Sequence, residues 1–266
     1  MSATARPIAL TIAGSDSAGG AGIQADLKTF HAFGVYGASA VTAITAQNTV
    51  GVHSVHLVPV PIVRAQIDAV AEDLRPAAVK TGMLATADIV DATADALLHH
   101  GLERYVLDPV MVATSGDRLL AADAERALLE RLVPLAQLVT PNAPEAALLT
   151  SVEVTGVAGL REAAQALVER GAGAALVKGG HLEGEEVVDL FWDGREERIW
   201  RARRVQSRHT HGTGCTLSAA VTAGMAAGRP LVEAVEAAIA YVGRAIRSAP
   251  GLGQGHGPVN HFAPAG

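Results

Sequence analysis

The chain of 266 residues has a single cysteine, Cys215, and it lacks a long apolar run near its start. One cysteine excludes an intrachain disulfide and a metal site built from several thiolates, and it fits a reducing compartment. The apolar run Ile8–Ala13 is too short for a signal peptide or a membrane span. We therefore expect a soluble, cytoplasmic protein with no membrane partner.

Aromatic residues are also scarce, at 3% of the sequence, although hydrophobic residues make up 49%. Most of the core must therefore consist of Ala, Val, Leu and Ile, which suits helices packed closely on a sheet. Basic residues are also fewer than acidic ones, 21 against 27, so the formal net charge is −6. This balance argues against a nucleic-acid-binding protein, and we interpret the basic patch Arg201–Arg204 as a solvated strand end or loop.

Apolar, β-branched segments alternate with helical patterns along the chain, which is typical of a mostly parallel sheet covered by helices on both faces. We predict one domain, residues 1–266, with an α/β fold: a three-layer αβα sandwich. In such sheets ligands bind beyond the carboxyl ends of the strands. The predicted strands are 8–13, 38–46, 55–60, 77–80, 105–107, 136–139 and 174–177, with a hairpin of 186–191 and 198–200; helices are predicted near 23–33, 160–170, 217–224 and 231–246, before an irregular tail.

The glycine-rich segment GSDSAGGAG, residues 14–22, follows the first strand and precedes a helix. It is not a dinucleotide-binding loop, because Ala25 fits the pattern only loosely and residues 38–50 contain no carboxylate for a ribose. Nor is it a P-loop, since Gly20-Ala21 stands where Lys-Ser/Thr is required. Two interpretations stay open: a tight turn, and a loop whose backbone approaches a ligand.

The segment HTHGTGCTLSAA, residues 209–220, combines a glycine turn with the start of a predicted helix. Gly212 and Gly214 permit backbone angles that are closed to other residues, so that successive N–H groups can converge. The free N–H groups and positive dipole end of the helix add to this. We favour a hole for an anion, or for charge that develops in a transition state, over a plain turn with an inert cysteine.

Three further segments place polar groups at strand or helix ends. In TPNAPEA, residues 140–146, Asn142 and Glu145 are spaced so that both can face one hydrated Mg²⁺, but the same spacing makes an ordinary helix cap, which we prefer. Lys178 ends a strand in LVKGGH, where it either binds phosphate or is simply solvated. Asp108, in LDPV, also ends a strand and can neighbour a metal or a phosphate.

Two histidine pairs, His53/His56 and His209/His211, have spacings that suit a metal site. A third ligand is not evident for either pair. We interpret all four as scattered surface histidines.

Taken together, these segments resemble the hydroxymethylpyrimidine/phosphomethylpyrimidine kinase branch of the ribokinase-like superfamily. Each short motif is weak, but the ordered set, which runs from Leu10 to Ala220, is specific, and the resemblance covers almost the whole chain. The matching segments are LTIAGSDSAGGAGIQADLKTF, TAITAQNT, KTGML, LDPVMVATSG, TPNAPEA, LVKGGH and HTHGTGCTLSAA.

The resemblance implies that ATP with Mg²⁺ phosphorylates the hydroxymethyl group of an aminopyrimidine and then its monophosphate to the diphosphate, in thiamine biosynthesis. It also implies a homodimer and a mobile flap at residues 110–116. The site residues carried over are Gly14, Asp26, Gln47, Met83 and Val110 for the pyrimidine, Asn142 and Glu145 for the Mg–phosphate end, with Glu145 as the metal ligand, Lys178 for the ATP phosphates, and Gly212, Thr213, Gly214 and Cys215 around the transferred phosphoryl group. To these we add Asp108 as a cofactor-binding candidate, from its place at a strand end.

Gln47 agrees with this implication on chemical grounds, because its amide offers an acceptor beside donors, as the edge of an aminopyrimidine does. Cys215 departs from the superfamily, much of which has an aspartate base there. A thiolate at a helix start, where the pKa of a thiol is often lowered, could accept the hydroxyl proton. We nevertheless expect the backbone hole to matter more than the sulfur, since the transition state is loose.

Two other functions remain open on the sequence. A pyridoxal-type kinase would use the same fold and a similar hydroxymethyl heteroaromatic, although Gln47 favours the pyrimidine. A non-catalytic pyrimidine-binding protein is disfavoured by the intact Lys178, Glu145 and glycine hole.

Overall fold

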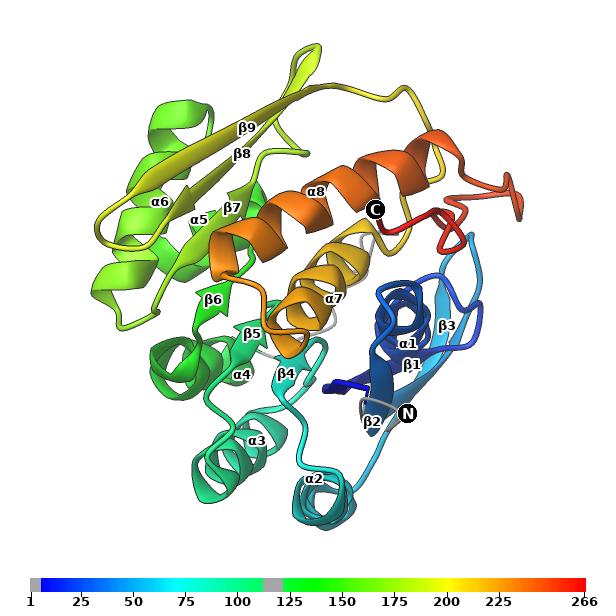
Figure 1. Cartoon of the computed structure of the whole chain (residues 1–266), viewed down its shortest axis with the longest axis vertical. Helices are drawn as coiled ribbons and strands as arrows, with labels where there is room; N and C mark the ends of the chain where they lie inside the picture. Colours follow the sequence, from blue (N-terminus) through cyan, green and yellow to red (C-terminus); the bar gives the residue numbers. More distant parts are fainter. Residues whose placement is uncertain (1–5, 112–121) are drawn as a thin grey trace, which may run out of the picture.

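The computed structural model describes residues 6–111 and 122–266, and these residues form one nine-stranded sheet of order β3-β2-β1-β4-β5-β6-β7-β8-β9 (Figure 1). The six strands from β2 to β7 in this order are parallel, and β3, β8 and β9 are antiparallel to their neighbours. The predicted, mostly parallel sheet is confirmed. The strands are β1 (Ile8–Asp16), β2 (Tyr36–Gln47), β3 (Val52–Leu57), β4 (Ala78–Thr81), β5 (Tyr105–Leu107), β6 (Leu138–Val139), β7 (Ala175–Lys178), β8 (Glu186–Trp192) and β9 (Glu197–Arg203).

Helices cover both faces of the sheet, which confirms the three-layer αβα sandwich. One face packs against α1 (Gly22–Ala32), α7 (Thr213–Ala226) and α8 (Leu231–Arg247). The other packs against α2 (Val60–Asp73), α3 (Ala87–His100), α4 (Ala122–Ala127), η1 (Leu128–Leu132), η2 (Val133–Leu135), α5 (Ala143–Thr150) and α6 (Val157–Glu169). Successive residues of a strand pack into opposite cores, because side chains alternate between the two faces of a sheet. Ala9 packs on the α7 side, whereas Leu10 packs on the α2 side.

Helix α7 shows how a core with few aromatic residues is filled. Every residue from Thr216 to Ala226 is buried, so this helix lies enclosed between the sheet, α1 and α8. Small side chains allow the close approach: a β-carbon on Gly224 would lie 2.8 Å from the Cβ of Ala234 on α8. A helix that is apolar all round belongs in such an enclosed position.

Two differences from the predicted elements have local causes. The third strand is Val52–Leu57 rather than 55–60, because Pro59 caps α2 and directs the chain into the helix at Val60. Helix α3 was not predicted, although Thr86 caps it and Gly101 ends it in the left-handed conformation. None of the helices within the described residues is long and apolar enough to span a membrane.

The tail after α8 is irregular, as predicted, but it is held against the body of the protein. The N–H of His256 donates to the carbonyl of Thr49 at 2.8 Å, and the N–H of His211 donates to the carbonyl of Gly257 at 3.1 Å. The tail therefore links the loop after β2 to the loop before α7.

The strand order reverses at β1, because β2 lies on one side of β1 and β4 on the other. The loops that leave β1, β2, β4, β5, β6 and β7 emerge at one edge of the sheet, where α7 also begins. A site at the carboxyl edge is the expected consequence of this topology.

Candidate active site

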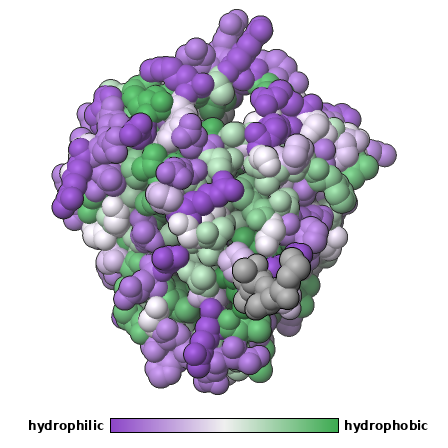
Figure 2. All heavy atoms as spheres, viewed as in Figure 1, coloured by the Kyte–Doolittle hydropathy of each residue, from purple (hydrophilic) through white to green (hydrophobic). Residues whose placement is uncertain are grey.

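A cleft of about 810 Å³ lies at the carboxyl edge of the sheet. Figure 2 shows the molecule hollowed between the β8–β9 hairpin and α8, with hydrophilic side chains around the opening. The predicted site residues among its lining are Gly14, Gln47, Met83, Asp108, Val110, Asn142, Glu145, Lys178, Gly212, Thr213, Gly214 and Cys215. The predicted flap covers residues 110–116, of which 112–116 lie outside the described residues.

The glycine turn before α7 is built by contact between two loops. Gly212 has φ +78°, and a β-carbon there would overlap the carbonyl oxygen of Gly20 in the first glycine loop. Helix α7 then starts at Thr213, and within the described part of the chain the N–H groups of Gly214 and Cys215 have no acceptor. Free N–H groups at a helix start form the expected anion hole.

Gly214 differs from the sequence-based expectation. Its φ is not positive, and a β-carbon there would meet only the Nζ of Lys178, at 3.3 Å. The expectation that both glycines adopt angles closed to other residues is therefore right for Gly212 and wrong for Gly214. The close approach of Lys178 instead brings its ammonium group beside the anion hole.

Cys215 is half-buried at the edge of this hole, and its surroundings bear on the protonation of its thiol. Burial raises the pKa of the thiol to about 12, Lys80 opposes the rise, and Asp108 and Asp26 add to it. The helix start does not compensate for lost solvation. Of the two protonation states left open on the sequence, the raised pKa favours the neutral thiol in the unliganded protein.

The charged end of the cleft combines Lys178 with two carboxylates. The Nζ of Lys178 lies 3.3 Å from Oδ1 of Asp108, whose Oδ2 accepts a hydrogen bond from Ser218 at 3.1 Å. Burial works against the charge on Lys178, but Asp108 and Glu145 together hold its pKa above the usual value. Lys178 is therefore a fixed cation beside the anion hole.

Asn142 and Glu145 form the helix cap that we preferred on spacing. The N–H of Glu145 donates to Oδ1 of Asn142 at 2.9 Å, and the N–H of Asn142 donates to Oε2 of Glu145 at 2.8 Å. Burial raises the pKa of Glu145 to about 7, which Lys178 opposes. The cap holds a carboxylate at the cleft wall, so the two interpretations of this motif are compatible.

The donor set fits Mg²⁺ bound mainly through phosphates. Asp108 and Glu145 supply carboxylates on either side of Lys178, and the described residues contain no group of three or more His, Cys, Asp or Glu side chains that could enclose a metal. Mg²⁺ typically takes one or two protein carboxylates and completes its shell with water and phosphate oxygens.

At the end of β2, which four strands separate from β7, the cleft forms a slot with one polar wall. A β-carbon on Gly14 would lie 3.2 Å from the sulfur of Met83, and Met83 packs with Val110. The polar wall is Gln47, which lies at the end of β2. A flat ring with a polar edge is the kind of ligand that fits such a slot.

His211 contradicts the interpretation of the histidines as surface residues. Its side chain is only 6% exposed, and its Nε2 lies 3.0 Å from Oδ2 of Asp16. Asp16 also accepts from the N–H groups of Ala18, Gly20 and Ala21. Burial opposes its ionisation, yet these hydrogen bonds, that from His211 first, keep the pKa of Asp16 below its usual value.

Asp26 lies away from the position that we predicted for it. It is completely buried behind the cleft, where it accepts hydrogen bonds from Thr11 at 2.7 Å and from Lys80 at 2.9 Å, and it does not line the pocket. Lys80 does line the cleft and was missed. A lysine inside the otherwise buried strand β4 was the signal that could have identified it.

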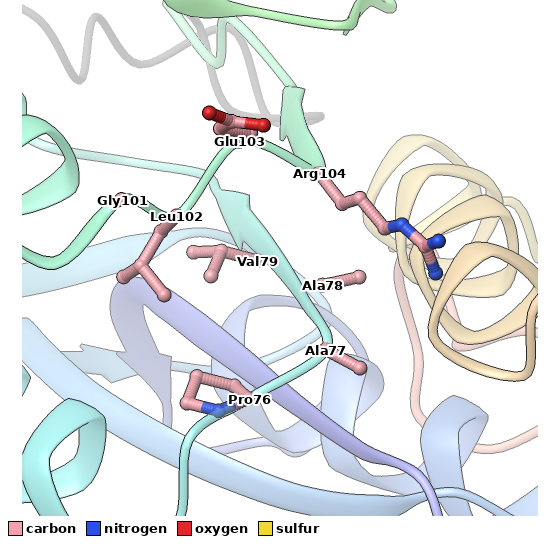
Figure 3. A pocket seen from close by; sticks show the side chains of 8 residues that line it. All are labelled: Pro76, Ala77, Ala78, Val79, Gly101, Leu102, Glu103 and Arg104. Carbon is pink, nitrogen blue, oxygen red and sulfur yellow. The ribbon is translucent and has the colours of Figure 1, made fainter.

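A second, smaller cavity of about 220 Å³ lies at the other edge of the sheet (Figure 3). It is bounded by the segments that enter β4 and β5, and its only charged side chains are Glu103 and Arg104. Arg104 points toward α7 and donates to the carbonyl of Met225 at 3.2 Å. Its charged groups are therefore remote from the anion hole.

Known proteins share both the sequence and the fold. The model of the phosphomethylpyrimidine kinase family matches residues 16–260. The hydroxymethylpyrimidine/phosphomethylpyrimidine kinase of Rhizobium meliloti is 58% identical over 96% of this chain and 97% of its own length, and that of Bacillus subtilis is 49% identical over 96% and 94%.

Among solved structures, the ADP complex of Bacillus subtilis pyridoxal kinase is 39% identical, with a TM-score of 0.90 over 97% of this chain and 98% of its own. The phosphomethylpyrimidine kinase of Clostridium difficile is 41% identical, with a TM-score of 0.82 over 91% and 100%. The family match, the high identity and the shared fold agree: the chain belongs to the phosphomethylpyrimidine kinase family.

Proposed function

We propose that this protein uses ATP and Mg²⁺ to phosphorylate hydroxymethylpyrimidine and then its monophosphate, in thiamine biosynthesis. The observation that carries the proposal is a single cleft that is lined by the anion hole, by Lys178 at the end of β7 and by Gln47 at the end of β2. A relative with this name, from Rhizobium meliloti, is 58% identical over 97% of its own length. A thiamine biosynthesis bifunctional protein from Geobacter sulfurreducens is 49% identical over 52% of its length.

Transfer breaks the bond between the γ-phosphorus and the bridging oxygen of ATP and forms one to the hydroxymethyl oxygen, whose proton is released. Lys178 and the N–H groups of Gly214 and Cys215 meet the charge of the moving group. Asp108 and Glu145 would hold Mg²⁺, which neutralises phosphate charge when bound. Because burial raises the pKa of the Cys215 thiol to about 12, we assign most of the rate to alignment rather than to proton removal by this thiol.

A second candidate substrate is pyridoxal. It is favoured by two structural neighbours, the pyridoxal kinases of Bacillus subtilis and Staphylococcus aureus, with TM-scores of 0.90 and 0.91. Their identities of 39% and 35% are lower than the 58% of the pyrimidine kinase relative. We therefore place pyridoxal second.

The decisive experiment supplies purified protein with ATP–Mg²⁺ and either hydroxymethylpyrimidine or pyridoxal, and separates the products by mass. We expect the pyrimidine monophosphate first and the diphosphate after it, and no product with Lys178→Met. Preferred turnover of pyridoxal would replace the first candidate with the second. A monophosphate without any diphosphate would remove the second step.

We also propose that the chain acts as one domain and assembles as a homodimer through β2 and β3. The continuous sheet supports the single domain. Support for the dimer is a group of exposed apolar side chains on these two strands: Tyr36 and Ile44 on β2 are 56% and 53% exposed, and Val55 and Leu57 on β3 are 42% and 41% exposed. Light scattering should give a dimer mass, and Ile44→Lys should lower it to that of a monomer; a monomeric wild type would contradict the dimer.

A further inference from the structure

The side-chain amide of Gln47 lies between two polar neighbours inside the cleft. Its Oε1 is 3.2 Å from Oγ1 of Thr45, and its Nε2 is 3.4 Å from Nε2 of His211. The two ends of a carboxamide have the same shape, so hydrogen-bond partners decide which end carries the oxygen. The neighbours of these two partners settle that choice.

His211 must carry a proton on Nε2. That nitrogen lies 3.0 Å from Oδ2 of Asp16, whose carboxylate already accepts three backbone N–H groups and remains ionised. A carboxylate only accepts, so Nε2 of His211 must donate, whatever the state of Nδ1. The proton on Nε2 points mainly toward Asp16, the nearer partner. An NH₂ group of Gln47 beside that N–H would place two donors together and repel it, whereas an amide oxygen is attracted to it and can share the proton in a three-centre bond.

Thr45 leads to the same choice from the other side. Its hydroxyl has one proton, and the backbone carbonyl of Ser15, 2.9 Å away, can only accept it. The Thr45 oxygen is then left as an acceptor toward Gln47. An NH₂ group satisfies it, whereas an amide oxygen would face a lone pair.

We propose that the Gln47 amide is held with its oxygen toward His211 and its nitrogen toward Thr45, half a turn from the orientation given above, and that this fixed polarity selects an aminopyrimidine over its oxo counterpart. The selection part rests on the proposed function. An aminopyrimidine edge has a ring nitrogen acceptor beside an amino donor, and the 4-oxo compound reverses both. A glutamine free to rotate fits either edge, but one fixed polarity fits one of them. His211 and Thr45 are positioning residues that set specificity through Gln47.

The polarity is tested without any turnover by long-range ¹H–¹⁵N correlation spectra of histidine-labelled protein. His211 is assigned from the resonance that disappears in His211→Phe. A proton on Nε2, in the neutral or the doubly protonated ring, supports the proposal. An unprotonated Nε2 would overturn it, because that nitrogen would then accept from the NH₂ of Gln47.

The selectivity is tested by the ratio of kcat/KM for hydroxymethylpyrimidine to that for its 4-oxo analogue. The wild type should prefer the amino compound by about ten- to a hundredfold, the discrimination typical of one bidentate pair. Thr45→Val and His211→Phe each release one side of Gln47, so each should bring the ratio to within about threefold of unity. General damage to the site lowers both rates and leaves the ratio unchanged.

Thr93→Val is the matched control, since Thr93 is also buried and donates to a backbone carbonyl, that of Ile89, at 2.7 Å. It should retain the wild-type ratio. A wild-type ratio in either Thr45→Val or His211→Phe overturns the proposed selection. If the wild type phosphorylates neither pyrimidine, the proposed function fails, while the spectra still decide the polarity.

Discussion

The carbonyl oxygen of Gly20 occupies the place that a β-carbon on Gly212 would need. The two glycines belong to loops almost 200 residues apart in the sequence, one after β1 and one before α7. Their contact fixes the start of α7 against the first loop. The geometry of the anion hole therefore depends on two backbones touching, which any larger residue at position 212 prevents.

Gly212→Ala should nearly abolish activity in a protein that still folds. The alanine must adopt a positive φ, at about 1–2 kcal/mol of the free energy of unfolding, and must also displace the Gly20 loop. A misplaced hole should lower kcat by roughly a hundredfold or more. The measurement is turnover together with denaturant unfolding.

Gly101→Ala is the control for the backbone cost alone, because Gly101 has φ +61° and nothing within 4 Å of a β-carbon. It should lose a similar free energy of unfolding and keep its activity. Gly214→Ala should keep the stability of the wild type. Its activity should fall only a few-fold, because the added β-carbon displaces the ammonium group of Lys178 slightly. Equal activity losses for Gly101→Ala and Gly212→Ala would show that the loop contact does not matter.

Cys215→Ser should keep activity within about tenfold of the wild type, since a general base contributes roughly a hundredfold or more. The reason is that burial raises the pKa of the thiol to about 12, so it is already protonated at neutral pH. Turnover from pH 6 to pH 9 should give parallel profiles for the two proteins. A loss of a hundredfold or more in the serine variant would identify the thiol as the base.

The sequence predicted those parts of the molecule that depend on local order. Strand ends follow from apolar runs bounded by glycine and proline, and parallel strands bring their carboxyl ends to one edge. This is why Asp108, Lys178 and the loop before α7 lie together as predicted. The capping box at Asn142 also follows from spacing within one turn of a helix.

Pairs formed across the fold could not be predicted in this way. His211 pairs with Asp16, 195 residues away, and Lys80 pairs with Asp26, 54 residues away. Spacing along the chain contains no signal for such partners. His211 was therefore taken for a surface residue, and Asp26 for a residue of the pocket wall. The expectation of a special backbone angle at Gly214 was wrong for a related reason. Whether a position requires glycine depends on its φ and on its neighbours in space, which the sequence does not give.

Glu145 should make the stability of the unliganded protein depend on pH. Burial raises its pKa in the folded state to about 7 from the ordinary value of 4.5, so the folded protein binds the proton more tightly. The stabilisation is complete below about pH 4.5 and is lost as the pH rises through 7. Glu145→Gln keeps the capping box, in which either residue serves, and removes the titration.

The variant should therefore match the wild type below about pH 4.5 and exceed its free energy of unfolding by about 1–3 kcal/mol at pH 8. Denaturant unfolding at several pH values measures the difference. Glu162→Gln, on the exposed side of α6, is the control and should leave the pH dependence of the wild type unchanged. A constant difference between Glu145→Gln and the wild type across this range would contradict the raised pKa.

The buried pair of Lys80 and Asp26 should separate stability from catalysis. Both side chains are fully buried. Burial by itself would lower the pKa of Lys80, but the charge of Asp26 keeps that pKa above its usual value. Lys80→Met alone leaves an unpaired buried carboxylate and should cost about 3–5 kcal/mol of the free energy of unfolding. Combining it with Asp26→Asn removes both charges and should recover most of that loss.

Activity should not recover with stability in the double variant. Lys80 borders the cleft, and its charge acts on Cys215, so this charge belongs to the field around the anion hole. We expect the double variant to be folded and at least about tenfold slower in kcat, because a fixed charge in a site shielded from water is worth more than in solution. Unfolding and turnover measured on the same preparations decide the point. If activity returns together with stability, Lys80 only balances the charge of Asp26.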